Sequence, residues 1–482
     1  CHYPTGRDPC SPHKSHNRHL LRQRKRQGQL LTMRTGLHWL HNRLTAPIDA
    51  ASLVFFRIGF GAIMAWEAWR FLSDGVVDRH FIAPDFYFKY LGFGWVEPWP
   101  GSWMYVHFYA LGALALCIAV GFLYRLSATL FALGYTYIFL IDQTLYQNHY
   151  YLICLVSLLM IFVPAHRTLS VDARLWPNTR SSFIPAWPLW LLRAQIAIVY
   201  FFGGVAKLNL DWLQGYPLRD WLPGSDFYLP LFSDLFYEGW VCLLFSYAGL
   251  LIDLLAAPLL LWGRTRAWAL ATLLLFHCMN KVLFGIGVFP VLASSLTLLF
   301  LPPTWPRRLF NWPHPGDTQP LFSRLRTPAL LALTAYLIVQ TLLPVRHFLY
   351  PGNVSWTEEG HRFAWHMKLR DKDCSAVFIL QSPNETWQVD PRDHLTSRQA
   401  RKMATRPYMA VQFAHYLVDY ARSVDMSPVK VRAHIDCSLN GRRDFPLIDP
   451  HLDLATQQYH MGSTHWILPL PHADPGELYD EY

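Results

Sequence analysis

Long runs of apolar residues alternate with short polar loops over the first two thirds of the chain. A helix that crosses a bilayer needs about 20 mostly apolar residues. Runs of roughly this kind recur at 50–71, 102–122, 127–142, 147–164, 187–206, 239–262, 267–283, 286–301 and 327–344. The pattern predicts a mainly α, polytopic integral membrane bundle with about nine transmembrane helices.

The pattern changes after the last apolar run. Three segments alternate between apolar and polar positions as strands do, namely 363–370, 376–381 and 429–439. Two helical stretches lie between them, within 397–425. We therefore expect a C-terminal α+β domain, and three parts in all: a basic, disordered tail at 1–46, a transmembrane domain at 47–344 and the α+β domain at 345–482.

Charge sets the expected orientation. The chain has 42 Lys and Arg against 33 Asp and Glu, a net charge of +9, and much of the excess lies in the tail and in alternate loops. The positive-inside rule then places the N-terminus in the cytoplasm, and an odd number of spans makes the α+β domain extracytoplasmic. This distribution accounts for the net positive charge, so we expect no nucleic-acid partner. Met33 precedes the first patterned segment, so we expect the true start of the protein there.

Composition agrees with a membrane part joined to a polar part. Hydrophobic residues make up 52% of the chain and charged residues 16%, while the mean hydropathy is only +0.14. The eight cysteines show no metal-site spacing. Cys374 and Cys437 can pair if their domain is extracytoplasmic; spacing alone does not decide it.

Lys207 ends the fifth apolar run, within YFFGGVAKLNLDWLQGYPLRDW at 200–221. Two interpretations are open. A lysine at a membrane boundary often extends to water as an anchor. Alternatively, Gly203 and Gly204 allow another element to approach, and Lys207 faces an enclosed pocket where it serves as a base.

Other polar side chains collect at the same predicted boundary. The outer ends of four further segments carry Asp142, Asn148 with His149, His277 with Asn280 and Lys281, and Arg346 with His347. Ionisable groups near spans are costly and usually functional, so we expect one shared cavity. Structural alternatives are a helix-end role for His149 and hydrogen bonding across helices for Asn280. The histidines share no local spacing, so no metal is expected.

The residues resemble those of the vitamin K-dependent γ-glutamyl carboxylase family, within the membrane proteins called HTTM. The similarity covers most of residues 48 to 470. Its most specific pieces are NHYYL at 148–152, YFFGGVAKLNLDWLQGY at 200–216, FHCMN at 276–280 and HFLYPGNVSW at 347–356.

The resemblance implies a carbon-carbon lyase with epoxidase activity. Reduced vitamin K, a hydroquinone of the menaquinol or phylloquinol type, would enter from the membrane lipid and react with O2. The oxygenated product would remove a γ-hydrogen from a glutamate of a polypeptide partner, and CO2 would add to give γ-carboxyglutamate while the quinone leaves as its 2,3-epoxide.

The resemblance also implies roles for individual residues. Lys207 matches the catalytic base and His149 a histidine of the carbanion and CO2 step. His277 and His347 match polar residues of the hydroquinone and glutamate pocket. Further matching positions, expected to bind substrate or quinone, are Asn280, Asn148, Arg57 and Trp356.

The sequence departs from animal members in three ways. Ala206 stands before Lys207 where they carry two adjacent lysines, the loop at 72–101 has no cysteine, and the chain lacks their longer lumenal extension. We therefore expect a bacterial-type homologue of the inner membrane, with the catalytic core but without propeptide recognition. A quinone-epoxidising enzyme with another acceptor, or a non-enzymatic quinone- or lipid-binding protein, are the alternatives. The acceptor and the oligomeric state are left open.

Overall fold

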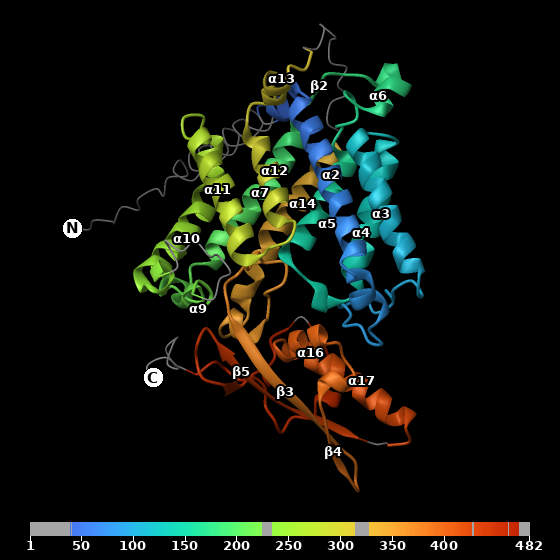
Figure 1. Ribbon diagram of the computed structural model, residues 1–482, viewed down its shortest axis with the longest axis vertical. Helices are drawn as coiled ribbons and strands as arrows, with labels where there is room; N and C mark the ends of the chain where they lie inside the picture. The colour runs from blue at the N-terminus through green and yellow to red at the C-terminus, as the bar shows by residue number, and fades with distance from the viewer. Residues whose placement is uncertain are drawn as a thin grey trace, which may run out of the picture.

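The computed structural model describes residues 39, 41–223, 234–313, 327–426, 429–460 and 462–471. Most of the predicted tail at 1–46, with Met33, lies outside these residues. The described chain forms a helical bundle with an α+β part at one end, coloured orange to red in Figure 1.

Nine helices of the described chain coincide with the nine predicted runs. Seven are long and apolar enough to cross a membrane: α2 (Ala51–Ser73), α3 (Trp103–Val120), α4 (Tyr124–Ile141), α7 (Trp187–Ala206), α10 (Gly239–Leu261), α11 (Arg266–Phe284) and α14 (Thr327–Val345). The other two, α5 (Asn148–Phe162) and α12 (Phe289–Thr297), are shorter but also apolar. The protein is thus a polytopic membrane protein, as predicted.

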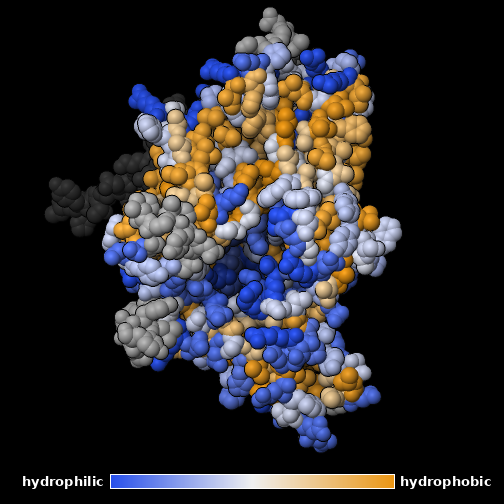
Figure 2. Space-filling model, viewed as in Figure 1, coloured by the Kyte–Doolittle hydropathy of each residue, from blue (hydrophilic) through white to orange (hydrophobic). Residues whose placement is uncertain are grey.

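The outside of the bundle is apolar because several helices bury only one narrow face. α11 and α14 leave most of their apolar side chains exposed, including Leu275, Leu331 and Leu342. In Figure 2 the helical part accordingly carries a broad hydrophobic surface. Such a surface is stable in lipid, where exposed apolar side chains carry no hydration cost.

One end of the bundle is closed by a small sheet and a buried ion pair. Strand β1 (Pro47–Asp49) pairs antiparallel with β2 (Phe183–Pro185). Asp49 accepts a hydrogen bond from Arg307 at 2.6 Å, and both side chains are buried. Arg307 belongs to α13 (Trp305–Phe310), so the pair ties α13 to the start of α2.

The C-terminal part is built on a four-stranded antiparallel sheet of order β4-β3-β5-β6. Its strands are β3 (Lys372–Gln381), β4 (Thr386–Val389), β5 (Lys430–Leu439) and β6 (Phe445–Pro446). β3 and β5 pair along ten residues with Cys374 directly opposite Cys437, and these two cysteines form a disulfide. The pairing that spacing left open is therefore present.

Two helices cover one face of this sheet. α16 (Ser397–Ala404) begins with a capping box: the side chains of Thr396 and Gln399 each accept a hydrogen bond from the backbone N–H of the other residue. α17 (Pro407–Ser423) packs its apolar side against alternate residues of β5, and the ring of Phe413 lies 4.9 Å from that of Phe378 on β3. The α+β prediction is confirmed.

The strand predicted at 363–370 is wrong. Phe363, Trp365 and Lys368 have positive φ angles of 61°, 60° and 51°, a backbone region that a strand does not use. The apolar residues of the segment belong instead to the core of the bundle, where Trp365 is fully buried and Phe363 and Met367 pack beside it. The alternating pattern therefore reflects a loop, not a strand: its apolar residues face the core of the bundle, and the residues between them face away from it.

The two parts are locked together by buried contacts. Phe88, in the loop after α2, is fully buried in the core of the C-terminal part. Asp211, in α8 (Leu210–Leu213) just after α7, accepts hydrogen bonds from Arg442 at 2.7 and 2.9 Å and from Asn440 at 2.6 Å.

Further short helices connect the larger elements: α6 (Val171–Leu175), α9 (Leu218–Trp221) and α15 (Val354–Thr357).

Candidate active site

The end of α7 is held tightly against α10. A Cβ on Gly204 would lie 2.7 Å from the side chain of Leu254 and 2.9 Å from its backbone nitrogen, and a Cβ on Gly203 would lie 3.3 Å from Asp253. Only glycine allows this approach. The glycine pair therefore brings another helix close to Lys207, as one of the two interpretations predicted.

Lys207 is buried in this contact. Its Nζ donates to Oδ2 of Asp253 at 2.6 Å and to the carbonyl oxygen of Gly203 at 3.2 Å, and it lies 5.2 Å from the ring centre of Trp212. The side chains of Lys207 and Asp253 are 7% and 4% exposed. An anchor would extend to water, so the geometry favours the interpretation in which Lys207 faces a pocket.

This pocket, the apolar cavity, has a volume of about 100 Å³ and brings three predicted site residues together. It is lined by Lys207, His277 and Asn280, with Asp253 and Tyr200 beside them. Nε2 of His277 lies 2.7 Å from the hydroxyl of Tyr200, which lies 2.8 Å from that of Thr297. Nδ1 of His277 finds no hydrogen-bond partner within the described ranges, so of the two ring nitrogens only Nε2 is hydrogen-bonded there.

A second cavity, the basic cavity, adjoins the first and has a volume of about 410 Å³. Figure 2 shows a hydrophilic hollow between the helical part and the C-terminal part. The described lining includes six Lys and Arg side chains but one carboxylate, Asp371: the cations are Lys368, Arg370, Lys372, Arg401, Lys402 and Arg406. An excess of cations around one hollow attracts an anionic group.

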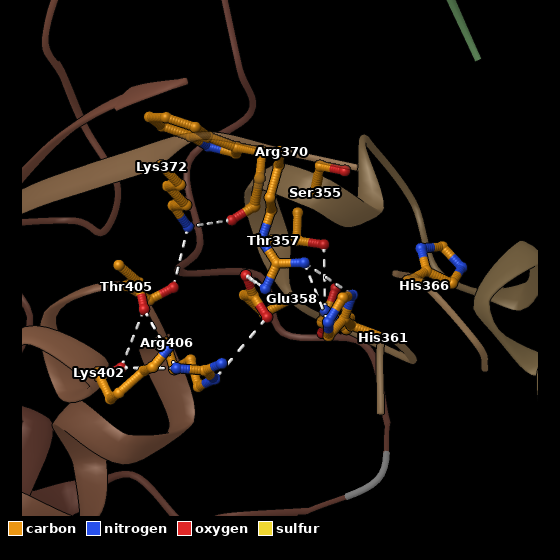
Figure 3. A network of polar contacts seen from close by, with 12 residues as sticks. Ser355, Thr357, Glu358, His361, His366, Arg370, Lys372, Lys402, Thr405 and Arg406 are labelled. Carbon is orange, nitrogen blue, oxygen red and sulfur yellow. Dashed lines mark hydrogen bonds and ion pairs between the residues drawn. The ribbon is translucent and has the colours of Figure 1, made fainter. Parts of the chain in front are cut away.

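Burial and mutual repulsion control the charges of this cavity. Burial lowers the pKa of Lys372 to about 7, and the positive charge of Arg406 lowers the pKa of Lys402 to about 7. Glu358 lies behind the wall and pairs with Arg370 at 2.5 Å and Arg406 at 3.9 Å, as Figure 3 shows. The arginines are thereby held in place, while the charges of the two lysines change near neutral pH.

The two cavities meet at shared side chains. Ile286, Phe289, Met367 and Lys368 line both. The ring of Phe289 lies 5.9 Å from that of His277 and 6.4 Å from that of His149. His149 is buried and lines the basic cavity, so a single ring separates the histidines of the two cavities.

Other predicted site residues support the walls. Asn148 donates to the carbonyl oxygen of His366 at 2.7 Å, which fixes the segment at 363–370, and it also lines the basic cavity. Trp356 is fully buried, and its carbonyl oxygen accepts a hydrogen bond from Lys372 at 2.6 Å. Trp356 therefore lies outside the basic cavity but fixes the position of one of its cations, Lys372.

Like Trp356, two further predicted residues lie outside both cavities. The ring of His347 contacts that of His366 at 4.6 Å, and its Nδ1 lies 2.7 Å from the carbonyl oxygen of Pro344. Arg57 lies in α2 near the end closed by β1 and β2. It donates to the carbonyl oxygens of Ala165 and Leu169 at 2.9 and 2.6 Å, which gives it a structural contact far from Lys207.

The sequence reasoning missed Asp253 and the basic cavity. Asp253 is the one acidic residue within the apolar α10, and a lone carboxylate in a span is a recognisable signal. The cations of the basic cavity come from the segment at 368–372 and from α16 with its following loop. Only the folded chain brings these two regions together. No group of three or more His, Cys, Asp or Glu with metal-site geometry occurs in the described part of the chain.

The fold and the cavities define an integral membrane protein with a C-terminal α+β domain and a buried polar centre at the junction. Residues 45–305 match the family described as the HTTM domain, and residues 326–473 match the lumenal domain of vitamin K-dependent gamma-carboxylase. The chain therefore belongs to the vitamin K-dependent γ-carboxylase family, and its C-terminal domain is extracytoplasmic. No solved structure shows a significant match.

Proposed function

We propose that this protein is a vitamin K-dependent γ-glutamyl carboxylase that couples epoxidation of a hydroquinone to carboxylation of protein glutamate. One observation carries the proposal: the apolar cavity that holds Lys207 shares a wall with a basic cavity. The reaction needs two unlike substrates at one point, a lipid-soluble quinone and a water-soluble carboxylate. Adjoining cavities of opposite character meet that need.

The apolar cavity supports the hydroquinone half. Lys207 accepts a proton only as a neutral amine; Asp253 can take the lysine proton and pass it out of the cavity, which leaves the neutral amine beside a carboxylate. The ammonium formed after deprotonation of the hydroquinone is then stabilised by the carboxylate at 2.6 Å. Met367 lines the small cavity, and its flexible side chain can move to admit the ring.

The basic cavity supports the glutamate half. Its cations bind the γ-carboxylate of the acceptor through charge-assisted hydrogen bonds. Neutralising that carboxylate also eases removal of the neighbouring γ-hydrogen, because the resulting carbanion carries further negative charge. His149 faces this cavity, where it can hold or deliver a proton.

Reduced vitamin K, O2, CO2 and the glutamyl residue give the 2,3-epoxide, water and γ-carboxyglutamate. The protein contributes water exclusion: Phe289, Ile286 and Met367 form an apolar wall where the cavities meet, and a strong base lasts only where water is kept out. We place the N-terminus in the cytoplasm and the protein in a bacterial inner membrane, with the glutamyl polypeptide reaching the site from the extracytoplasmic side.

The test uses the purified full chain in detergent with chemically reduced menaquinone, a short glutamate-rich peptide and labelled bicarbonate. Quinone epoxide and peptide-bound label are followed together. Lys207→Ala is compared with Lys281→Ala, because Lys281 is an exposed lysine of α11 that lines neither cavity.

We expect both products from the wild type and from Lys281→Ala, and neither from Lys207→Ala. Epoxide without label would show that the acceptor is not a glutamyl peptide of this kind. Absence of both products with several quinones would overturn the proposal and leave a quinone- or lipid-binding protein.

A further inference from the structure

A third cavity lies at the junction on residues that the proposed reaction does not use. This junction cavity, of about 410 Å³, is lined from α4, α5 and α14 of the bundle and from α17 and the segment 458–467 of the outer domain. None of its described lining residues lines the apolar or basic cavity. It is therefore a separate space that both parts of the protein close.

A buried arginine with free donors points into this space. Arg362 is 7% exposed, and its guanidinium stacks 4.6 Å from the ring centre of Tyr408 and 5.3 Å from that of Tyr90. One terminal nitrogen donates to Gln143. Nε and the other terminal nitrogen have no hydrogen-bond partner among the described residues. Buried donors of a charged group are costly to leave unpaired, so the cavity is built for an acceptor.

Three neighbouring groups complete a set of donors. Tyr90 and Tyr408 line the same cavity, and their buried hydroxyls have no hydrogen-bond partner in the part of the chain that the structure describes. Arg346 lies beside them, since it donates to the carbonyl oxygen of Arg362 at 2.5 Å. Two guanidinium groups and two hydroxyls suit the several oxygens of a phosphate.

The cavity also contains two carboxylates, and both are accounted for. Glu358 pairs with Arg370 and Arg406, which face the basic cavity. Burial raises the pKa of Glu359, which favours its neutral form. The lining therefore pairs two guanidinium groups, Arg346 and Arg362, with a carboxylate held from the far side and one whose charge burial disfavours.

Much of the remaining wall is apolar and adjoins exposed apolar residues of the bundle. Leu140 of α4, Leu343 of α14 and Phe93 line the cavity. Phe93 is 38% exposed, and the neighbouring Leu342 of α14 is 62% exposed. α14 is among the least covered of the membrane helices. A phosphate on the arginines would thus carry its acyl chains directly into the bilayer.

We propose that the junction cavity binds the phosphate headgroup of an anionic phospholipid. The guanidinium groups of Arg362 and Arg346 hold the phosphate, and an acyl chain lies along Leu140 and Leu343. Because the wall comes from both the bundle and the outer domain, the bound lipid braces the two parts against each other. The inference does not depend on the proposed reaction.

The test measures lipid retention and thermal stability of the full chain. The protein is delipidated in detergent and titrated with dioleoyl phosphatidylglycerol, with dioleoyl phosphatidylcholine, with oleate and with inorganic phosphate. Bound lipid is counted by native mass spectrometry, and melting is followed by intrinsic fluorescence. Arg362→Gln removes the guanidinium, and Leu343→Trp fills the apolar wall from a lipid-facing helix. Arg79→Gln is the matched control, an exposed arginine of an outer loop outside the cavity.

We expect one phosphatidylglycerol per chain, a higher melting temperature with it, and affinity about tenfold or more weaker for Arg362→Gln. Leu343→Trp should weaken lipid binding while Arg79→Gln leaves it unchanged. If inorganic phosphate protects as well as the lipid does, the site binds a free anion and the lipid assignment is overturned. If Arg362→Gln and Leu343→Trp both retain the lipid as the wild type does, the proposed lipid site is also overturned. If Arg362→Gln fails to fold, Leu343→Trp decides alone.

Discussion

Asp253→Asn is the most informative change to the centre described above. Asparagine has nearly the same size and still accepts a hydrogen bond from Lys207, so the change removes the charge and leaves the shape. It also removes the group that can take a proton from the ammonium. We expect both the stability of the protein and its epoxidation rate to fall.

The structure sets the size of the effect. For Nζ and Oδ2 at 2.6 Å, an effective dielectric constant of about 20 gives a Coulomb attraction of about 6 kcal/mol. Part of this is offset because the pair has lost hydration, and breaking a buried pair costs about 3–5 kcal/mol. If a similar stabilisation applies to the ammonium formed in catalysis, turnover should fall about a hundredfold or more.

Epoxide formation and thermal melting in detergent measure the two effects. Asp49→Asn is the matched control, because Asp49 and Arg307 form a buried pair of the same 2.6 Å length at the opposite end of the bundle. It should cost similar stability and leave the turnover of the folded fraction unchanged. In the double variant Lys207→Met/Asp253→Asn, stability should recover toward that of the wild type while turnover stays absent.

Two results would refute this reasoning. The first is wild-type turnover in Asp253→Asn, which would show that the carboxylate has no part in the proton transfer. The second is a double variant whose stability loss equals the sum of the single losses, because that would mean the two groups do not interact.

Three further changes test other parts of the structure. Gly204→Ala places a Cβ 2.7 Å from a leucine side chain of α10 and should destabilise the protein by about 1–3 kcal/mol in melting experiments, whereas Gly59→Ala, with nothing within 4 Å, should be tolerated. Cys374→Ser opens a link across 63 residues and should cost about 4 kcal/mol, measured by the same melting assay. Burial lowers the pKa of Lys372 to about 7, so raising the pH from about 6 to about 8 should remove most of its charge and raise KM for a glutamyl peptide. Lys372→Met should reduce this dependence to the part due to Lys402, whose pKa is also about 7.

These three predictions have clear contrary outcomes. Equal melting of the two alanine variants would show that the glycine pair is not needed for the helix contact. A Cys374→Ser protein as stable as the wild type would show that the disulfide adds nothing to the domain. A KM profile unchanged by Lys372→Met would place acceptor binding elsewhere.

Much of the fold follows from local pattern. A long apolar run has only one stable form in lipid, a helix that satisfies its own backbone, so all nine runs appear as helices. Alternation predicted β5 in the same way, because Val431, Ala433 and Ile435 face one core. The segment at 363–370 shows the limit of this reasoning, since its alternating residues follow two different environments.

The site was predictable in part. Lys207, His277 and Asn280 were expected at one boundary, and they line one cavity. The partner Asp253 was overlooked because it stands in the interior of α10, and only the close packing of α7 and α10 brings it to Lys207. The basic cavity depends on contacts between residues about 30 positions apart, which no local pattern encodes.

The burial of Phe88 has a consequence for how the protein is made. This ring belongs to the core of the outer domain, yet it lies between the first two membrane helices, and the residues that surround it are synthesised almost 300 positions later. During translation the loop must cross the membrane early and stay uncovered until the outer domain follows. That domain thus completes a core begun between the first two membrane helices, and the outer domain expressed alone would lack one of its own core side chains.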